Sequence, residues 1–413
     1  MADALPFPSG LSVLEAQSRI VEIAAKCTLP VERLALEQAL GRILAVDMRA
    51  PADVPGFVNS AMDGFALRGM DLPATGTKAF RLCGEILAGG SAAPAVEQDT
   101  CVRITTGAAL PRGADTVVMK ENTRVQGERV EIDAGTPTGA NVRAAGEDYR
   151  LGDLALHQGT RLTPAGVAVL AGFGMTHAEV VARPRGVLLT TGDELHAPGT
   201  PLGFGGIYDS NRFSLGGLLE QHGSALLRHE RLRDVPAQLR DALVRAGEDA
   251  DLIISSGGVS AGEADFLPRL IREVGEVYFW KVRIKPGMPF LFGRVGKALV
   301  FALPGNPVSG IATFLTLVKP ALAAMSRVRA APASLRARLK SALHKRHTRA
   351  EFQRAALECD AHGNLWAAPH AKQGSGMLRG VAEADALIVL PEDAHEFAVG
   401  TVVEVLPLPG WPA

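Results

Sequence analysis

The chain has 413 residues, and its 43 lysine and arginine residues balance 44 aspartate and glutamate residues to a net charge of -1. This length exceeds what one hydrophobic core usually organises, which predicts two to four domains at roughly 100–200 residues each. The balanced charge lacks the basic excess of nonspecific nucleic-acid binders, so it argues against that class of function.

The 4 cysteines lie far apart and form neither a C-x-x-C pair nor a zinc-binding spacing. They indicate reduced, buried thiols in a cytosolic protein. The first residues lack a basic segment followed by an apolar run, and the longest apolar segment, residues 314–325, is interrupted by Lys319 and Pro320. The sequence therefore predicts a cytoplasmic protein with no membrane span.

The first half of the chain changes texture twice. Apolar residues at helical spacing predict an amphipathic helix over residues 11–27, and residues 31–46 continue in the same helical style. From residue 51 to about 145, short apolar runs alternate with Gly, Pro, Asn and Asp, which predicts a mostly β insertion able to fold as its own unit. Leu162-Thr163-Pro164 then supplies an N-cap and a first-turn proline for a helix over residues 165–171.

The second half predicts an α/β unit followed by a β unit. Strands alternate with helices between residues 186 and 325, which is typical of a doubly wound sheet built from βαβ units. The predicted strands are 187–190, 225–229, 252–255 and 299–303, and the predicted helices are 212–222, 237–246, 266–274 and one that begins near 308. Alternating apolar and basic residues over 335–340 predict a small barrel or sandwich. The basic cluster 344–347 is interpreted as a solvated loop, since no other ligand-type residues adjoin it at metal spacing.

Two strand ends carry polar loops. The strand 252–255 runs into the glycine-rich loop Ser255-Ser-Gly-Gly-Val-Ser-Ala-Gly-Glu-Ala-Asp265, and the strand 186–190 runs into Thr191-Gly-Asp-Glu-Leu195. Bare backbone N–H groups and hydroxyls suit a phosphate, and the carboxylates suit a divalent cation. Because ligands collect outside the carboxyl ends of parallel strands, the two loops predict one crevice. An ordinary polar turn remains the alternative for each loop alone.

Two further segments fit an anionic ligand. Lys281 and Lys285 lie four residues apart in what reads as an extended run, which predicts both ammonium groups on one face, where a pyrophosphate would balance their charges. A solvated strand face is the alternative. Pro304-Gly-Asn-Pro307 turns from a strand into a helix, so an oxyanion could dock on its backbone N–H groups, and a purely structural turn is equally open.

Eight motifs occur in order over nearly the whole chain. They are Asn59-Ser-Ala-Met-Asp-Gly-Phe-Ala66, Arg103-Ile-Thr-Thr-Gly107, Gly146-Glu-Asp148, Thr191-Gly-Asp-Glu-Leu195, Tyr208-Asp-Ser-Asn211, the 255–265 loop, Lys285-Pro-Gly287 and Leu303-Pro-Gly-Asn-Pro307. Together they resemble the motif series of the MoeA-type molybdopterin molybdenumtransferases, a group that includes the E domain of gephyrin. One departure is Met288, where a third lysine often follows in that family.

The resemblance implies an enzyme of molybdenum cofactor biosynthesis that inserts molybdate into adenylylated molybdopterin and releases AMP with Mg²⁺. It also implies a multidomain α/β fold in an elongated homodimer. Its parts would be an elongated α+β linker domain (1–50 and 146–185), an inserted mostly β domain (51–145), a doubly wound MogA-like molybdopterin-binding domain (186–326) and a C-terminal β-barrel domain (327–413). Other cofactor-biosynthesis proteins or molybdoenzyme chaperones are further expected partners, whereas nucleic acid and membranes are not.

Site residues are carried over motif by motif. The predicted catalytic residues are Asp63, Thr106, Asp148, Glu194, Asp234, Asp265, Lys281 and Lys285, with Glu194 and Asp265 as the metal ligands. The predicted substrate-binding residues are Ser255, Gly257, Gly258, Ser260, Pro304, Gly305, Asn306, Pro307, Arg354 and Ser375. Asp63, Thr106 and Asp148 would act across the dimer. Alone, an Asx turn or N-cap would explain each aspartate, and a surface position would explain Arg354.

Two other functional classes remain open at this point. One is a binding or scaffold protein that holds the cofactor without turnover, and the acids at 63, 148, 194 and 265 argue against it. The other is a molybdopterin adenylyltransferase, which would normally lack the insertion and the C-terminal β domain. The chain shows no Ser-His-Asp arrangement, Walker lysine or G-x-G-x-x-G turn, which argues against a hydrolase triad, an NTPase and a dehydrogenase.

Overall fold

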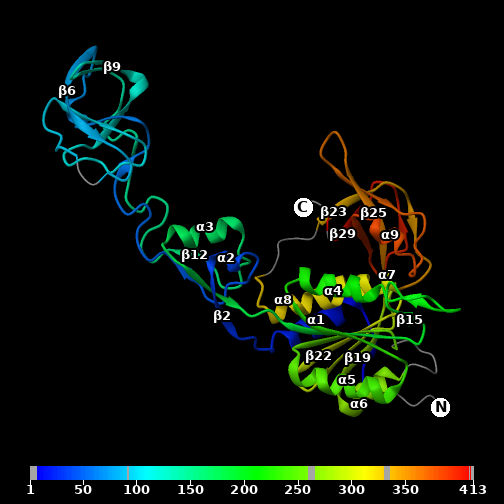
Figure 1. The fold of residues 1–413 in the computed structure, drawn as a ribbon. Helices are drawn as coiled ribbons and strands as arrows, with labels where there is room; N and C mark the ends of the chain where they lie inside the picture. Colours follow the sequence, from blue (N-terminus) through cyan, green and yellow to red (C-terminus); the bar gives the residue numbers. More distant parts are fainter. Residues whose placement is uncertain (1–6, 91–92, 259–265, 330–334, 409, 411–413) are drawn as a thin grey trace.

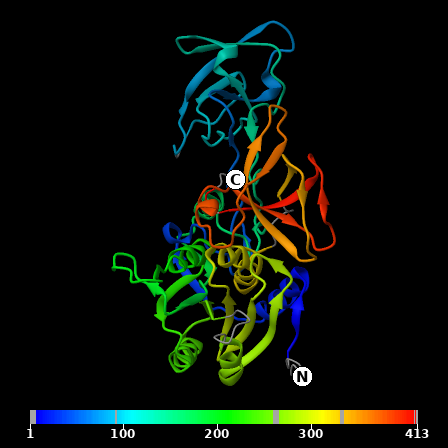
Figure 2. The same cartoon turned by 90° about the vertical axis from the view of Figure 1, so that its right-hand side faces the viewer.

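The computed structural model describes residues 7–90, 93–258, 266–329, 335–408 and 410. The chain is elongated, with the inserted β unit at one end, a narrow linker in the middle, and the α/β unit and the C-terminal β unit together at the other end (Figure 1). The perpendicular view shows the same separation between the insertion and the α/β unit (Figure 2). The insertion is built from one continuous stretch of the chain, whereas the α/β end combines residues far apart in sequence.

The predicted N-terminal helix is confirmed as α1 (Val13–Ala24). Ser12 caps it in a reciprocal capping box, because the Ser12 hydroxyl accepts from the Glu15 N–H at 3.2 Å and the Glu15 carboxylate accepts from the Ser12 N–H at 2.8 Å. Its buried stripe packs against α8 (Lys319–Met325) of the α/β unit. Helices α1 and α8, which lie about 300 residues apart in the chain, thus belong to the same hydrophobic core.

The predicted helix over residues 31–46 is wrong. The segment forms the strand β2 (Val31–Ala35) and only one helical turn, α2 (Leu36–Ala39). The physical reason is tertiary, since β2 pairs along its length with β13 (His177–Val181), more than 140 residues away. The apolar residues that suggested a helical stripe are instead buried between this ladder and α3 (Pro164–Gly172).

The linker brackets the insertion. In it, α3 begins as predicted, with the Thr163 hydroxyl accepting from the Gly166 N–H at 3.2 Å and Pro164 in the first turn. Strand β3 (Met48–Arg49) leads out of the linker, and β12 (Leu154–Leu156) returns and pairs with it. The two segments that connect the linker to the insertion therefore lie side by side.

The insertion is mostly β, as predicted. Its six-stranded sheet has the order β8 (Thr116–Met119), β5 (Gly64–Leu67), β7 (Thr100–Ile104), β6 (Thr77–Ile86), β10 (Arg129–Asp133) and β9 (Thr123–Gln126). Short pieces complete it: β4 (Asn59–Ser60), β11 (Val142–Arg143) and the 3₁₀ turns η1 (Gly69–Asp71) and η2 (Lys120–Asn122). Separate apolar clusters contain Phe65 and Ala66, neighbours whose side chains point to opposite faces of β5, so both faces of this sheet are covered.

The α/β unit is the predicted doubly wound sheet. Its order is β1 (Ser9–Leu11), β19 (Gly275–Val282), β21 (Leu291–Val295), β22 (Ala298–Leu303), β18 (Leu252–Ser256), β14 (Arg185–Thr191) and β17 (Ala225–Leu232). The last four are parallel, whereas β21 runs antiparallel to both neighbours. Helices α5 (Pro236–Asp249) and α6 (Leu267–Val274) cover one face. Helices α1, α4 (Asn211–Gln221), α7 (Pro307–Thr313) and α8 and the π-helical turn Phe314–Val318 cover the other (Figure 1).

Among the described residues, one helical stretch, Pro307–Met325, would be long and apolar enough to cross a membrane, but 78% of its apolar 18-residue window is buried within the protein. Its apolar residues lie in the main core of the α/β unit beside those of α1. The stretch is thus accounted for as a core element.

The C-terminal unit is a closed barrel. Strands β25 (Ala350–Cys359), β26 (Leu365–Pro369), β23 (Leu335–Leu339), β29 (Val402–Pro407) and β27 (Ala386–Leu390) pair in that order, and β27 pairs back to β25. The remaining pieces are β24 (Leu343–His344), β28 (Glu396–Phe397) and α9 (Arg379–Ala382). Strand β20 (Ile284–Lys285), which lies in the chain between β19 and β21 of the α/β sheet, joins the barrel by pairing with β25. A segment of the α/β unit therefore contributes an edge strand to the barrel.

Candidate functional site

A cleft of about 630 Å³ lies outside the carboxyl ends of β14, β18 and β22. The predicted site residues that line it are Glu194, Asp234, Gly257, Gly258, Pro304, Gly305, Asn306 and Pro307. They come from four different loops of the parallel sheet, so the structure brings these sequence-distant motifs together. We call this the strand-end cleft. Asp265 and Ser260 lie outside the described residues.

The glycine loop of the strand-end cleft requires glycine at Gly257. Its φ is +102°, and a Cβ there would lie 2.6 Å from the Thr191 carbonyl oxygen. The Gly257 N–H donates to the Leu303 carbonyl at 3.1 Å, which ties this loop to the loop after β22. The tight-turn interpretation is therefore supported, because the close approach of the backbones requires glycine at this position. Anion binding by this loop stays a prediction.

The two serines of this loop have different places. Ser255 is fully buried on β18, and its hydroxyl has no hydrogen-bond partner among the described residues. Ser256 lines the cleft and accepts from the Asn211 side-chain amide at 2.7 Å, and the same amide lies 2.7 Å from the Gly305 carbonyl. Asn211 thus joins the glycine loop to the Pro304–Pro307 turn.

A buried network fixes Asn211 at the start of α4. Asp209 is 2% exposed, and it accepts from the Thr190 hydroxyl at 2.6 Å and from the Arg212 N–H at 3.0 Å. The His229 Nε2 lies 3.4 Å from the same carboxylate. Burial disfavours the charged form, but these hydrogen bonds outweigh it and hold the pKa of Asp209 below its ordinary value. The segment Tyr208-Asp-Ser-Asn211 is one of the eight motifs named above, but its pattern did not predict this structural role for Asp209.

The C-terminal barrel supplies one wall of the cleft. Gly376 and Leu378 line it. The Asn306 side-chain amide donates to the Ser375 hydroxyl at 3.1 Å, and the Val308 N–H donates to the Ser375 carbonyl at 3.1 Å. Ser375, a predicted substrate-binding residue, is thus held against the Pro304–Pro307 turn.

Arg354 lies beneath this wall. It is 1% exposed, and its guanidinium donates to the carbonyls of Lys372 at 2.8 Å and Met377 at 3.0 Å. Burial lowers its pKa. Arg354 is not at the barrel surface, so that alternative is wrong, and the contacts it makes are those of a residue that shapes the 372–377 loop. Its predicted contact with an oxyanion stays a prediction.

The two predicted lysines do not share an extended face, and that prediction is wrong. Strand β19 ends at Val282 and β20 pairs with a different sheet, while Lys281 adopts a left-handed backbone with φ +60°. The Lys281 ammonium lies 4.2 Å from the Trp280 ring centroid, and the Lys285 ammonium lies 2.9 Å from the Glu351 carboxylate. Neither lysine is among the residues lining the strand-end cleft within the described chain.

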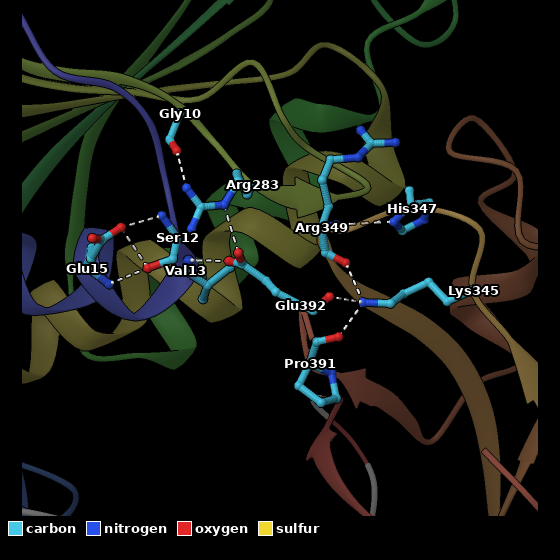
Figure 3. Close-up of polar contacts among 10 residues, drawn as sticks. All are labelled: Gly10, Ser12, Val13, Glu15, Arg283, Lys345, His347, Arg349, Pro391 and Glu392. Atoms are coloured by element: carbon cyan, nitrogen blue, oxygen red, sulfur yellow. Dashed lines mark hydrogen bonds and ion pairs between the residues drawn. The ribbon is translucent and has the colours of Figure 1, made fainter. Parts of the chain in front are cut away.

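The cluster 344–347 is not a uniformly solvated loop, which corrects that interpretation. Lys345 is 1% exposed, and its ammonium donates to the carbonyls of Arg349, Pro391 and Glu392 (Figure 3). The His347 Nε2 lies 3.1 Å from the second oxygen of Glu351, and burial lowers the His347 pKa. Figure 3 also shows how Arg283 joins the Gly10 carbonyl to the Glu392 carboxylate, so the N-terminal strand, the α/β unit and the barrel meet here.

Three predicted catalytic residues lie away from the cleft. The Asp63 carboxylate accepts from the Thr106 N–H and hydroxyl, both at 2.9 Å, and lies 3.6 Å from the Lys120 ammonium. The Thr106 bonds, reinforced by Lys120, lower the pKa of Asp63. Asp148 is exposed where the chain returns towards the linker. None of the three is among the described residues that line the cleft, and Figures 1 and 2 place the insertion, which carries Asp63 and Thr106, far from the α/β unit.

The strand-end cleft offers oxygen donors that suit a divalent cation. Glu194 and Asp234 present carboxylates to the cleft, and hard oxygen donors suit Mg²⁺, which takes one or two carboxylates and completes its shell with water and substrate phosphates. Within the described ranges, no three His, Cys, Asp or Glu side chains form a metal-holding group. The residues present thus fit a Mg²⁺ shared with a substrate rather than an all-protein cage.

Comparison with known proteins identifies the relatives of this chain. The MoeA N-terminal region (domain I and II) matches residues 11–174, a probable molybdopterin binding domain matches 187–324, and the MoeA C-terminal region (domain IV) matches 336–408. A molybdopterin molybdenumtransferase of Haemophilus influenzae is 36% identical over 400 residues, which cover 96% of this chain and 98% of that protein. Molybdopterin molybdenumtransferase 2 of Mycobacterium tuberculosis is 36% identical over 95% of this chain and 98% of its own length.

A solved structure supports the same family relationship. The molybdopterin biosynthesis MoeA protein of Pyrococcus horikoshii superposes with a TM-score of 0.85 at 28% identity, covering 97% of this chain and 100% of that one. The predicted multidomain α/β fold class is thereby confirmed. The chain belongs to the MoeA family of molybdopterin molybdenumtransferases.

Proposed function

We propose that this chain inserts molybdate into adenylylated molybdopterin and releases AMP, with Mg²⁺ bound at the strand-end cleft. The observation that carries the proposal is the convergence of two glycine-bearing strand-end loops and the Pro304–Pro307 turn around carboxylates in one cleft. Backbone N–H groups and small hydroxyls suit the phosphates of such a substrate. The carboxylates beside these groups suit a Mg²⁺ ion bound to the phosphates.

The chemical task of the chain is to hold two anions together. At about 4 Å, two unit charges repel by roughly 4 kcal/mol at an effective dielectric near 20. No protein nucleophile is needed, because the dithiolene sulfurs of molybdopterin would themselves coordinate the molybdenum that molybdate supplies. We assign to the chain the positioning of phosphate by Ser255, Gly257, Gly258 and Ser260, and of the oxyanion by the Pro304–Pro307 turn, Arg354 and Ser375.

The cation would be held by Glu194 and Asp265, with Asp234 in the same cleft. When bound, Mg²⁺ supplies neutralisation of phosphate charge. Lys281 at the end of β19 and Lys285 in β20 would add positive charge. The ion pair of Lys285 with Glu351 supports a role in which this ammonium is held in one position before substrate arrives.

The second half of the site would come from another subunit. None of Asp63, Thr106 and Asp148 lines the cleft of its own chain, and the insertion lies far from the α/β unit, which supports a homodimer in which the insertion of each subunit faces the cleft of the other. The chain would work in the cytoplasm beside other cofactor-biosynthesis proteins or molybdoenzyme chaperones. The domain boundaries predicted above stand as part of this proposal.

AMP release tests the proposal. Purified protein incubated with adenylylated molybdopterin, molybdate and Mg²⁺ should yield AMP and molybdenum cofactor, and omission of Mg²⁺ should abolish both. Binding of the substrate without AMP release would instead identify a non-catalytic scaffold. Consumption of ATP in the presence of molybdopterin alone would identify an adenylyltransferase.

A further inference from the structure

A second cavity, of about 440 Å³, lies between the linker and the α/β unit, away from the strand-end cleft. The linker contributes residues around Arg42, Arg161 and Arg183, and the α/β unit contributes the end of α4 at His222 and the start of α8 at Lys319. We call this the interdomain cavity. Its walls come from segments that no site motif covers.

Positive charge dominates the interdomain cavity. Five guanidinium or ammonium groups line it, against Glu220 as the one carboxylate among its lining residues. Two of the five are engaged, since Arg42 pairs with Glu32 at 2.5 Å and Arg161 donates to the Gly41 carbonyl at 2.9 Å. The side chains of Arg183, Lys319 and Arg329 have no hydrogen bond or ion pair with any residue in the described ranges. Three exposed cations thus line the cavity without an ion-pair partner among the described residues, in a chain whose net charge is -1.

His222 adds an unsatisfied polar atom. Its ring lies 5.9 Å from that of Phe314, and its Nε2 is buried without a hydrogen-bond partner among the described residues. Burial, together with the nearby Lys319 and Arg161 charges, lowers the pKa of His222 to about 4. Burial also lowers the pKa of Lys319, although part of its side chain stays exposed. A buried polar atom and a partly desolvated ammonium group are stabilised when an anion accepts their hydrogen bonds.

We propose that the interdomain cavity binds a phosphate-type dianion, held by Arg183, Lys319 and Arg329 with His222 at its inner wall. Guanidinium groups match the oxygens of a tetrahedral phosphate, and several cations are required to offset a double charge. Such a ligand bridges the linker to the α/β unit, and so it couples the unit that carries the insertion to the unit that carries the strand-end cleft. This site is independent of the proposed reaction.

Histidine NMR tests the proposal with inorganic phosphate as the probe. In protein labelled with ¹³C-histidine, the resonance that disappears in His222→Asn reports on this cavity alone. Phosphate at millimolar concentration should shift that resonance saturably and raise the His222 pKa by about one unit or more, because an opposite charge within hydrogen-bonding range favours the imidazolium. Chloride at equal ionic strength should produce no saturable shift.

Charge variants provide the controls. Arg183→Gln/Lys319→Gln should weaken phosphate binding at least tenfold, and Lys319→Arg should retain it. Arg269→Gln/Arg272→Gln removes the same charge from α6, on the other face of the sheet, and should leave the His222 titration unchanged. Unchanged binding in the first double variant, or a shift that follows ionic strength alone, overturns the proposal. If AMP binds more tightly than phosphate, the ligand is a nucleotide, and equal binding assigns it to free phosphate.

Discussion

The strand-end cleft and the Asp63 patch (Asp63, Thr106 and Lys120) are both assigned to one reaction, yet they are built in different ways. The cleft is enclosed by loops of a buried parallel sheet, and the C-terminal barrel of the same chain closes one wall. The Asp63 patch is half exposed on an isolated β unit and is organised by two bonds from Thr106. On the proposed dimer, one half of the site would be pre-formed in each chain, whereas the other half would require a second surface.

Mixed dimers give the largest expected effect on this comparison. Asp63→Ala and Glu194→Gln should each reduce AMP release by at least about 100-fold, since each removes a charged group from one half of the site. In a statistical mixture of the two variant chains, half of the dimers carry one intact composite site, which should restore about a quarter of wild-type activity. Rescue is measured as AMP release after subunit exchange. Two inactive parents that stay inactive when mixed would place both halves in one chain.

Gly257→Ala should be the most destabilising change in the cleft. The φ of +102° and the predicted 2.6 Å contact with the Thr191 carbonyl exclude a side chain without a backbone shift, at a cost of roughly 3 kcal/mol. Gly217→Ala is the matched control, because it lies in α4 with no atom within 4 Å of a new Cβ and should stabilise by about 1 kcal/mol. Urea unfolding distinguishes the two. Equal stability of both variants would refute a strained glycine floor.

Glu351→Gln should disturb the position of Lys285 from the barrel side. Glu351 is 6% exposed and contacts both Lys285 and His347, so its loss leaves the Lys285 ammonium without its partner. Because Lys285 remains partly exposed, we expect a loss of only about 1 kcal/mol of stability, together with a several-fold rise in the KM for substrate. The control Glu358→Gln removes the exposed partner of Lys340 and should change neither quantity. An unaltered KM in Glu351→Gln would remove the positioning role of Glu351.

Sequence patterns located the cleft better than they located the lysines. The loops after β14, β18 and β22 follow from strand polarity alone, since parallel strands must end at the same edge. The segment from Lys281 to Lys285 looked like one strand because local alternation says nothing of which sheet each residue joins. The helix prediction for residues 31–35 was wrong for the same reason, because their partner strand β13 lies far along the chain. Asp209 was missed because its role depends on Thr190 and His229, which share no motif with it.

The smallest expected effect lies in the acid titration of the Asp63 patch. The Thr106 N–H and hydroxyl stabilise the charged carboxylate, so the pKa of Asp63 lies below its ordinary value of 3.8. A carboxylate with a lowered pKa stabilises the fold above its unfolded pKa and loses this contribution as pH falls through the folded value. The Thr106 amide resonance should therefore stay constant above pH 4 and move only at stronger acidity. In Asp63→Asn this movement should vanish while the fold persists, because the side-chain carbonyl still accepts from Thr106. A Thr106 resonance that titrates near neutral pH would contradict the hydrogen-bonded arrangement and leave the half-exposed side of the comparison without its organising contact.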